Sequence, residues 1–331
     1  MNIIETRDLR KEFTVSVKTG KLRRSRRTVA AVDGVSLAIQ RGEIVGYLGP
    51  NGAGKSTTLK MLTGVLTPSS GEVAVCGFKP VPQRLKLARR IGVVFGQRST
   101  LWWDLPLRDS FELLRHIYRV PPAEHEARLA KCRAMLELDE FLDTPVRQLS
   151  LGQRMRGELT AALLHGPEIL FLDEPTIGLD VVSKQAVREF LAELGGRGDT
   201  TIVLTTHDLA DIERLCRRIV VIDHGRVVHD GSIEALHARY GSRRRVIADL
   251  DEPLTAEVDL PGVRLESSLE SSLALRLTFT IDGSTSVGPL VSHLAASGRL
   301  RDLTIAEPEI EDVIARLYQS DAPVPLQSQP A

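Results

Sequence analysis

The feature that most constrains this chain is the glycine-rich stretch Gly49-Pro50-Asn51-Gly52-Ala53-Gly54-Lys55-Ser56-Thr57. It fits the pattern G-x-x-x-x-G-K-[ST], in which a loop wraps the phosphates of a nucleotide. The apolar run Ile44–Leu48 before it is typical of a buried strand, and residues 57–62 after it are typical of the first turns of a helix. Because strand, loop and helix follow in the order that the motif requires, we expect a P-loop α/β fold.

The residue types in this loop suit a polyanion. Glycine lets the backbone approach the phosphates without a clashing Cβ, and successive N–H groups and the helix start then point at the negative charge. We expect Lys55 to reach the outer phosphates and the Ser56 hydroxyl to hold Mg²⁺. The other interpretation, a glycine-rich turn with an incidental lysine, is weak because motif and context agree.

Charge and composition exclude several classes of protein. Lys and Arg together number 43, as do Asp and Glu, and this zero net charge argues against a nucleic-acid partner. No apolar run approaches the length that crosses a bilayer, and the N-terminus lacks the layout of a secretion signal. Any role at a membrane would then depend on a partner protein that spans it. The isolated cysteines Cys76, Cys132 and Cys216 indicate a reducing cytosol.

The chain is expected to divide into three parts. Residues 1–240 alternate short apolar runs with helical patterns, as in a mainly parallel sheet covered by helices. The best strand candidates are 91–95, 169–172, 201–204 and 219–222. Within this part, residues from about 98 to 155 are predicted to form a helical insert, with helices at 107–118 and 123–138.

A smaller α+β domain is predicted over 243–318, and residues 319–331 are expected to form a disordered tail. Its candidate strands are 246–248, 275–281 and 303–305, and its candidate helices are 287–296 and 309–318.

Two carboxylates follow the apolar run 169–172. Such a run would fix Asp173 and Glu174 at the carboxyl edge of the sheet, where α/β proteins bind ligands. Asp173 suits a Mg²⁺ shell, and Glu174 can act as the general base that polarises an attacking water. The pair is a weak signal alone and a strong one together with the phosphate loop.

Residues 149–153 read Leu-Ser-Leu-Gly-Gln and open a predicted helix. Ser150 is a good N-cap residue, and Ser150, the bare backbone of Gly152 and the positive helix end would together bind an anion. Taken alone, the segment is more economically interpreted as a capped helix.

Two further polar residues follow predicted strands. Gln97 comes after 91–95, where its amide could touch both Mg²⁺ and water, and His207 comes after 201–204, where it could hold a terminal phosphate or position Glu174. Neither is informative alone, since a single such residue is more often structural.

Taken in order, these motifs resemble the nucleotide-binding subunit of an ABC transporter over residues 1–240. The resemblance implies a P-loop NTPase domain of the ABC type that binds ATP with Mg²⁺, in which Lys55, Glu174 and His207 are catalytic. It also implies that Ser150, Gly152 and Gln153 of one subunit cap the ATP held by the loop of another.

Other roles rest on the resemblance in the same way. Asp180 contacts the partner's site, Gln97 couples the site to the helical insert that docks on a membrane subunit, and an aromatic ring near the N-terminus, here Phe13, stacks on adenine. The chain departs from the pattern at Leu151, where a second glycine is usual. It departs again in a long basic insertion after Phe13, which leaves the register there open.

The run 95–106 and the end of the chain at 303–318 are similar to ATPases of bacterial sodium and drug exporters that have separate permeases, including viologen or antibiotic exporters. This resemblance implies an ATP-hydrolysing subunit at the cytoplasmic face of the membrane. It would pair with a second copy or a like subunit and power a permease that exports a drug-like or other small molecule. The alternative is a soluble ATPase acting as a regulatory, translation or repair factor.

Two segments leave alternatives open. Trp102 and Trp103 are either core residues of the insert or part of an apolar groove for a permease helix. The basic segment 18–27 is most simply a solvated loop, and its other interpretation is a contact with anionic lipid headgroups or an acidic partner.

Overall fold

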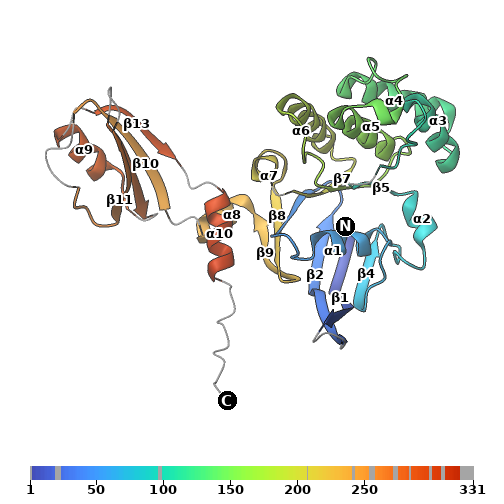
Figure 1. Ribbon diagram of the computed structural model, residues 1–331, viewed down its shortest axis with the longest axis horizontal. Coiled ribbons are helices and arrows are strands. Elements are labelled where there is room, and N and C mark those ends of the chain that lie inside the picture. The colour runs from blue at the N-terminus through green and yellow to red at the C-terminus, as the bar shows by residue number, and fades with distance from the viewer. Residues whose placement is uncertain are drawn as a thin grey trace. The chain divides into compact units, whose positions relative to one another are not determined.

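The computed structural model divides the chain into two compact units, Met1–Gly231 and Ser232–Ala331 (Figure 1). It describes residues 2–18, 24–95, 99–206, 208–240, 243–252, 258–270, 275–282, 285–297, 300–306 and 310–320. The domain limits expected from the sequence, 1–240 and 243–318, put the helix α8 (Ile233–Tyr240) in the first part, whereas it belongs to the second compact unit.

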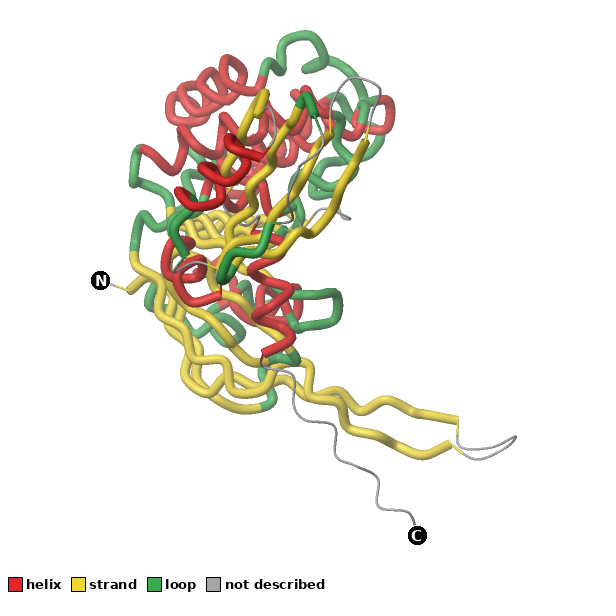
Figure 2. The backbone as a smooth tube through the Cα atoms, turned by 90° about the vertical axis from the view of Figure 1, so that its left-hand side faces the viewer, coloured by secondary structure: helices red, strands yellow, loops and turns green. Residues whose placement is uncertain are grey.

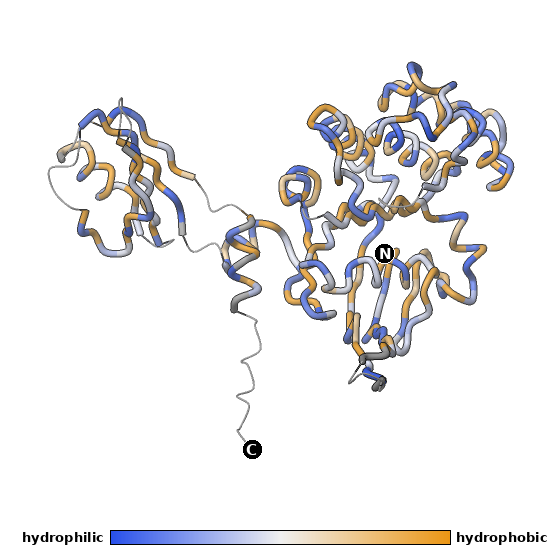
Figure 3. Tube along the Cα trace, viewed as in Figure 1, coloured by the Kyte–Doolittle hydropathy of each residue, from blue (hydrophilic) through white to orange (hydrophobic). Residues whose placement is uncertain are grey.

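The first unit is built on a six-stranded sheet in the order β5-β6-β7-β3-β8-β9. From β5 through β8, neighbouring strands are parallel. The strands are β3 (Ile44–Leu48), β5 (Ile91–Phe95), β6 (Ile169–Asp173), β7 (Thr201–Thr205), β8 (Arg218–Asp223) and β9 (Arg226–Ser232). All five strands predicted in this region are therefore confirmed, because apolar runs buried on both faces are the clearest strand signal. Figure 3 shows the same apolar character along the centre of this sheet.

A second, antiparallel sheet has the order β2-β1-β4. Its strands are β1 (Asn2–Lys18), β2 (Arg24–Gln40) and β4 (Ser70–Val75). β1 and β2 are paired from Asn2 to Lys18 with several register shifts. The loop predicted at 18–27 is therefore wrong for Lys18, which ends β1, and for 24–27, which lie in β2; residues 19–23 lie outside the described residues. β4 pairs only with the first part of β1, from Ile4 to Arg10.

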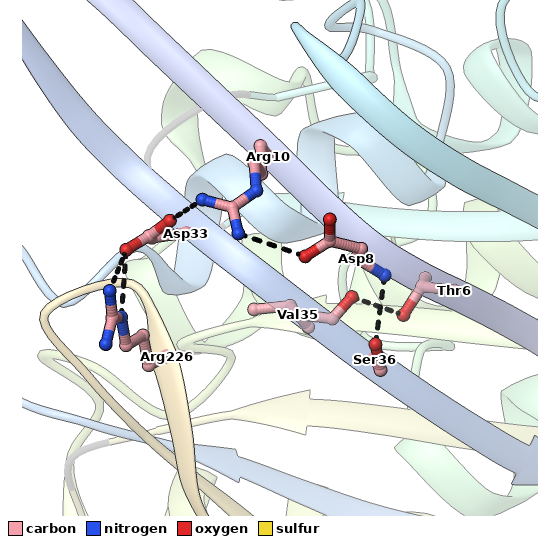
Figure 4. Close-up of polar contacts among 7 residues, drawn as sticks. All are labelled: Thr6, Asp8, Arg10, Asp33, Val35, Ser36 and Arg226. Carbon is pink, nitrogen blue, oxygen red and sulfur yellow. Dashed lines mark hydrogen bonds and ion pairs between the residues drawn. The ribbon is translucent and has the colours of Figure 1, made fainter.

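A hydrogen-bonded group braces the middle of this hairpin (Figure 4). Thr6 Oγ1 donates to the Val35 carbonyl over 3.0 Å at a register shift of β1. Asp33 of β2 accepts from Arg10 of β1, and it also accepts two bonds from Arg226 of β9, at 2.8 and 2.6 Å. The hairpin is thereby tied to the six-stranded sheet.

The helix α1 (Lys55–Leu62) packs between the two sheets. One apolar core is formed by residues of this helix and of both sheets, such as Ile4 of β1, Val45 of β3 and Met61 of α1, each fully buried. The phosphate loop therefore stands on the best-packed part of the unit.

Most of the remaining helices of this unit lie on the other side of the parallel sheet (Figure 1), whereas α2 (Arg84–Ala88) contributes Leu87 to the core that holds α1. The others are α3 (Leu107–Tyr118), α4 (Pro122–Leu136), the 3-10 turn η1 (Val146–Gln148), α5 (Leu151–Leu163), α6 (Val181–Gly196) and α7 (Leu209–Leu215). The predicted helix at 107–118 is confirmed with the same bounds, and that at 123–138 is confirmed as α4.

The second unit holds an antiparallel sheet in the order β11-β12-β10-β13. Its elements are α8, β10 (Arg243–Leu250), β11 (Val263–Glu270), β12 (Leu275–Asp282), α9 (Gly288–Ser297), β13 (Leu300–Ala306) and α10 (Ile310–Ser320). Leu290 and Leu294 of α9 pack on Val246, Ala248 and Phe279 of the sheet. Every strand and helix predicted here is confirmed, and β11 is an additional strand; residues 321–331 of the predicted tail lie outside the described residues.

Within the described ranges, no helix is both long and apolar enough to cross a membrane.

Candidate functional site

The phosphate loop joins β3 to α1 and depends on its glycines. A Cβ on Gly49 would overlap the carbonyl oxygen of Ile222, and one on Gly54 would overlap that of Ala31. Gly54 is the N-cap of α1 with φ of 107°, and no side chain caps this helix. Around Gly52, with φ of +83°, a Cβ would meet nothing within 4 Å. Among the described residues, the first amides of α1 thus have no side-chain partner, as a phosphate cradle requires.

Lys55 folds back across this loop. Its Nζ donates to the carbonyl oxygens of Gly49, at 2.6 Å, and Pro50, at 3.1 Å. Burial lowers the Lys55 pKa, and the nearby carboxylates of Glu174 and Asp173 oppose that shift. The cation therefore lies where loop and carboxylates meet.

Asp173 ends β6 directly beside β7, in register with Thr205. Its Oδ1 accepts from Thr205 Oγ1 at 2.6 Å and from Ser56 Oγ at 3.3 Å. Among the described residues no three His, Cys, Asp or Glu side chains form a metal cluster. One hydroxyl and one carboxylate nevertheless fit Mg²⁺, which usually takes few protein ligands and completes its shell with phosphate and water oxygens.

Glu174 follows Asp173 in a strained conformation, with φ of 56°. Its N–H donates to the Thr205 carbonyl over 2.9 Å, and its own carbonyl accepts from the Ile177 N–H over 3.3 Å. A left-handed non-glycine residue costs about 1–3 kcal/mol and is typical of active sites. This tight turn holds Glu174 at the carboxyl edge of the sheet, as predicted.

Ser150 is the N-cap of α5, as predicted. Its Oγ accepts from the Gln153 N–H over 3.2 Å, and the Gln153 side chain accepts from the Ser150 N–H over 2.9 Å, which makes a complete capping box. Leu151, the departure from the family pattern, is 37% exposed. A Cβ on Gly178 would meet Leu151 Cδ2 at 3.1 Å, so the larger side chain packs there without disturbing the cap.

Asp180 caps the next helix, α6. It accepts from the Ser183 N–H at 2.9 Å and the Ser183 hydroxyl at 2.7 Å, and these bonds lower the pKa of Asp180. A Cβ on Gly152 would overlap Ser183 Oγ, so the starts of α5 and α6 lie against each other. The structure thus brings Gly152 and Asp180 together within one chain.

A buried ion-pair group behind Glu174 was missed by the sequence analysis. Asp211 of α7 is fully buried and accepts from Arg188 at 2.5 Å and from the Thr176 hydroxyl at 2.5 Å. Asp208 accepts from Lys184 at 2.9 Å. The four-residue spacing of Lys184 and Arg188, which puts both on one helix face, was the available signal. This group fixes the segments after Glu174 and before α7.

Three other predicted site residues remain: Gln97, His207 and Phe13. Gln97 and His207 lie outside the described residues. Phe13 lies in β1, 40% exposed, opposite Val29 of β2, with Lys11 Nζ 5.2 Å from its ring centre. Gly54 touches β2 at Ala31, so this part of the hairpin runs past the phosphate loop.

Trp102 and Trp103 are 37% and 52% exposed, so their interpretation as core residues is wrong. Arg154 lies over the Trp103 ring at 5.7 Å, and the Trp102 N–H donates to Ser110. The exposed turn between β5 and α3 carries these rings because the core of the insert is already filled by residues such as Phe111.

Comparison with known proteins agrees with this geometry. Residues 32–177 match the family model described as ABC transporter. The chain is 35% identical over 212 residues to the ABC transporter ATP-binding protein NatA of Bacillus subtilis, covering 64% of this chain and 86% of that protein. It is 38% identical over 224 residues to the Nod factor export ATP-binding protein I of Paraburkholderia xenovorans, covering 67% of this chain and 73% of that protein.

A solved structure shares the fold as well. It is a dimeric, post-hydrolysis state of an ATP-binding cassette bound to ADP and phosphate, with a TM-score of 0.59 and 29% identity over 70% of this chain and 98% of that one. The P-loop fold, the paired carboxylates and the capped second helix are therefore those of an ATPase, and this chain belongs to the family of ABC transporter ATP-binding proteins.

Proposed function

We propose that this ATPase powers a separately encoded permease that exports a drug-like or other small molecule. The observation that carries the proposal is the division of phosphate-binding elements between two helix starts. The phosphate loop that ends at Gly54 lies with a lysine and two carboxylates, whereas Ser150 is the N-cap of a separate helix. The named relatives, an ABC transporter ATP-binding protein and an export ATP-binding protein, support export.

In this proposal the backbone N–H groups of 52–56 and Lys55 hold the phosphates of ATP. Ser56 and Asp173 hold Mg²⁺, together with Gln97. Glu174 accepts a proton from the attacking water, and His207 secures the terminal phosphate. Phe13 stacks on adenine.

The second half of the site comes from another copy or a like subunit, through Ser150, Gly152, Gln153 and Asp180. Apolar side chains surround that half and are at least 36% exposed; they are Leu151, Ile177, Val181 and Val182. Val181 and Val182 are 83% and 79% exposed. Exposed apolar residues beside a functional polar group are typical of a subunit interface, and the solved cassette noted above is dimeric.

The exposed rings of Trp102 and Trp103 support a permease contact, since tryptophan is favoured as an interface anchor. We place the ATPase at the cytoplasmic face of the membrane as a peripheral subunit. We further assign ATP hydrolysis to residues 1–240 and leave 243–318 as a separate domain, with no nucleic-acid partner.

The experiment for the shared site mixes two inactive variants. Ser150→Arg should abolish turnover and leave ATP binding by the single chain intact, whereas Lys55→Ala removes the phosphate contact on the other half. Mixed dimers then carry one composite site that is intact, and the mixture should regain activity. If binding by Ser150→Arg is lost as well, the Ser150 segment belongs to the same chain's site and the shared arrangement is wrong.

Hydrolysis and transport are tested separately. Glu174→Gln should keep ATP binding and lose about 10²- to 10⁴-fold in turnover, the usual contribution of a general base. Near-normal turnover would remove Glu174 from this role. Co-purification of the tagged chain with an integral membrane protein distinguishes a transporter subunit from a soluble factor.

A further inference from the structure

Within the described ranges, no third strand pairs with the outer part of the β1–β2 hairpin. β4 pairs with β1 only as far as Arg10, whereas β1 and β2 remain paired to Lys18 and Arg24. We call residues 12–18 and 24–30 the basic arm. Figure 2 shows it as two yellow strands extending beyond the sheet to which they belong. Every side chain described in the arm, at 12–15 and 26–30, is exposed.

The charge of the arm is one-sided. Glu12, at its inner end, is the only acid in the arm, and between residues 13 and 32 the sequence holds no Asp or Glu, whereas the chain as a whole has a net charge of zero. The cations in this stretch are Lys18, Lys21, Arg23, Arg24, Arg26 and Arg27. Lys21 and Arg23 lie outside the described residues, so the structural argument rests on the paired strands.

The nearest acid on β2 does not neutralise the arm. Asp33 already accepts hydrogen bonds from Arg10 and from the Nε and Nη2 groups of Arg226, at the inner end of the arm (Figure 4). The bonds to Asp33 lower its pKa, with the hydrogen bond from Arg226 as the largest cause. The same bonds link β1, β2 and β9 where the hairpin leaves the sheet.

One face of the arm is also apolar. Antiparallel partners share a face, so Phe13 lies with Val29, and Val15 lies with Arg27. Phe13, Val15 and Val29 are 40 to 42% exposed. A two-stranded ribbon gains little stability by itself. Its aliphatic side chains next to arginines suit a partner surface that carries negative charge on the outside and apolar groups beneath.

We propose that the basic arm binds the surface of an anionic lipid bilayer, with Arg26 and Arg27 at the lipid phosphates and Val15 among the headgroups. Polybasic segments are attracted to the negative cytoplasmic leaflet, and apolar side chains add to that attraction at the interface. Cations lie on both faces of the ribbon, because Arg26 and Arg27 are adjacent in a strand. A lipid surface accepts such a spread of charge without a matching pattern of acids.

A permease would be a poorer partner for this arm. The cytoplasmic loops of membrane proteins carry an excess of Lys and Arg, so a cationic arm would be repelled there. Lipid binding also goes beyond the proposed function, because it needs neither ATP nor a permease and can be measured on the purified chain.

The test is co-sedimentation of the full chain with vesicles of phosphatidylcholine containing phosphatidylglycerol, compared with phosphatidylcholine alone. Binding is expected only to the anionic vesicles, and it should weaken as salt shortens the range of electrostatic attraction. Arg26→Gln with Arg27→Gln should weaken it about 25-fold, since each cation near such a surface contributes about fivefold.

The matched control is Lys86→Gln with Arg89→Gln, two exposed cations at α2 in the same unit. This control should bind as the unaltered chain does, and equal thermal unfolding midpoints will show that both variants fold. Equal binding to both vesicle types, or an arm variant that binds as well as the control, would overturn the proposal.

Two competing partners are separated in the same experiment. If a DNA duplex at equal phosphate concentration displaces the chain from vesicles, the arm is a nucleic-acid surface and the proposal fails. If the arm variant keeps vesicle binding and loses co-purification with a membrane protein in detergent, the arm is a permease contact and the proposal fails as well.

Discussion

The helices α1 and α5 both begin where the sequence predicts contact with phosphate, yet their first turns are built in opposite ways. α1 begins at Gly54, in a left-handed conformation, and no side chain caps it. α5 begins at Ser150, and Gln153 completes a reciprocal capping box. Every helix start leaves backbone N–H groups without helical partners. Those of α5 are partly satisfied within the chain, whereas those of α1 have no side-chain partner in the described part of the chain.

This difference assigns different tasks to the two helix starts. We expect α1 to gain its cap from a bound phosphate, which would make its first turn a strong binding element. α5 is complete without ligand, and the Ser150 oxygen already accepts from the Gln153 N–H. The hydroxyl proton of Ser150 remains a donor for an outside oxygen. α5 therefore presents one donor from a preformed helix, which suits a surface that closes over a nucleotide held elsewhere.

The largest expected difference between the two helix starts is in catalysis. Lys55→Ala should lower turnover about 10²- to 10³-fold, as does the loss of one preorganised group that stabilises developing charge. Lys60→Ala, at an exposed position of the same helix, is the control and should leave turnover within about twofold. Steady-state phosphate release measures both. An equal loss in the two variants would mean that the general charge of α1 matters, rather than a contact with phosphate.

The far end of α5 should make stability depend on pH. His165 stacks on Tyr118 with ring centres 4.1 Å apart, and its Nε2–H donates to the Ile91 carbonyl over 2.9 Å. Its buried Nδ1 has no hydrogen-bond partner within the described part of the chain. Burial is the main cause that lowers the pKa of His165 from 6.5 to about 4.

Because the unfolded chain takes up this proton more readily, His165 lowers stability as pH falls from about 6.5 to about 4, and not above that window. The cost across it is about 3 kcal/mol, at 1.36 kcal/mol for each pH unit. Urea unfolding at a series of pH values measures it, and His165→Gln should remove that part of the slope. An unchanged slope in this variant would show that His165 titrates normally in the folded chain.

Sequence reasoning succeeded where one local signal was enough. The strands at 44–48 and 91–95, the helix at 107–118 and the cap at Ser150 depend on short apolar runs, on periodicity or on a single side chain. It failed for β2, whose outer half is exposed and whose arginines look like those of a loop. The bond from Thr205 to Asp173 was not foreseen, because it depends on the register between β6 and β7.

Glycine substitutions at the two helix starts should differ in how strongly they destabilise the fold. Gly54→Ala forces a Cβ onto the Ala31 backbone oxygen at positive φ, at an expected cost of about 2–3 kcal/mol. Gly152→Ala overlaps the Ser183 side chain and no backbone atom, at an expected cost of about 1–2 kcal/mol. Thermal unfolding measures both. In a double-mutant cycle, the destabilisations by Gly152→Ala and Ser183→Gly should be non-additive by about 1 kcal/mol, because the two residues are in contact. The destabilisations by Gly54→Ala and Ser183→Gly should be additive.

The smallest difference concerns the two serines. Ser150→Ala removes the cap of α5 and should cost about 1 kcal/mol without nucleotide, and Ser150→Asp should restore most of it because Asp caps equally well. Ser56→Ala loses only the 3.3 Å bond to Asp173 and should cost less than Ser150→Ala without nucleotide. With ATP and Mg²⁺ the order should reverse, since Ser56 then supplies a metal ligand. If ATP with Mg²⁺ raises the unfolding temperature of Ser56→Ala as much as that of Ser150→Ala, then α1 does not hold the metal and the contrast between the two helix starts is lost.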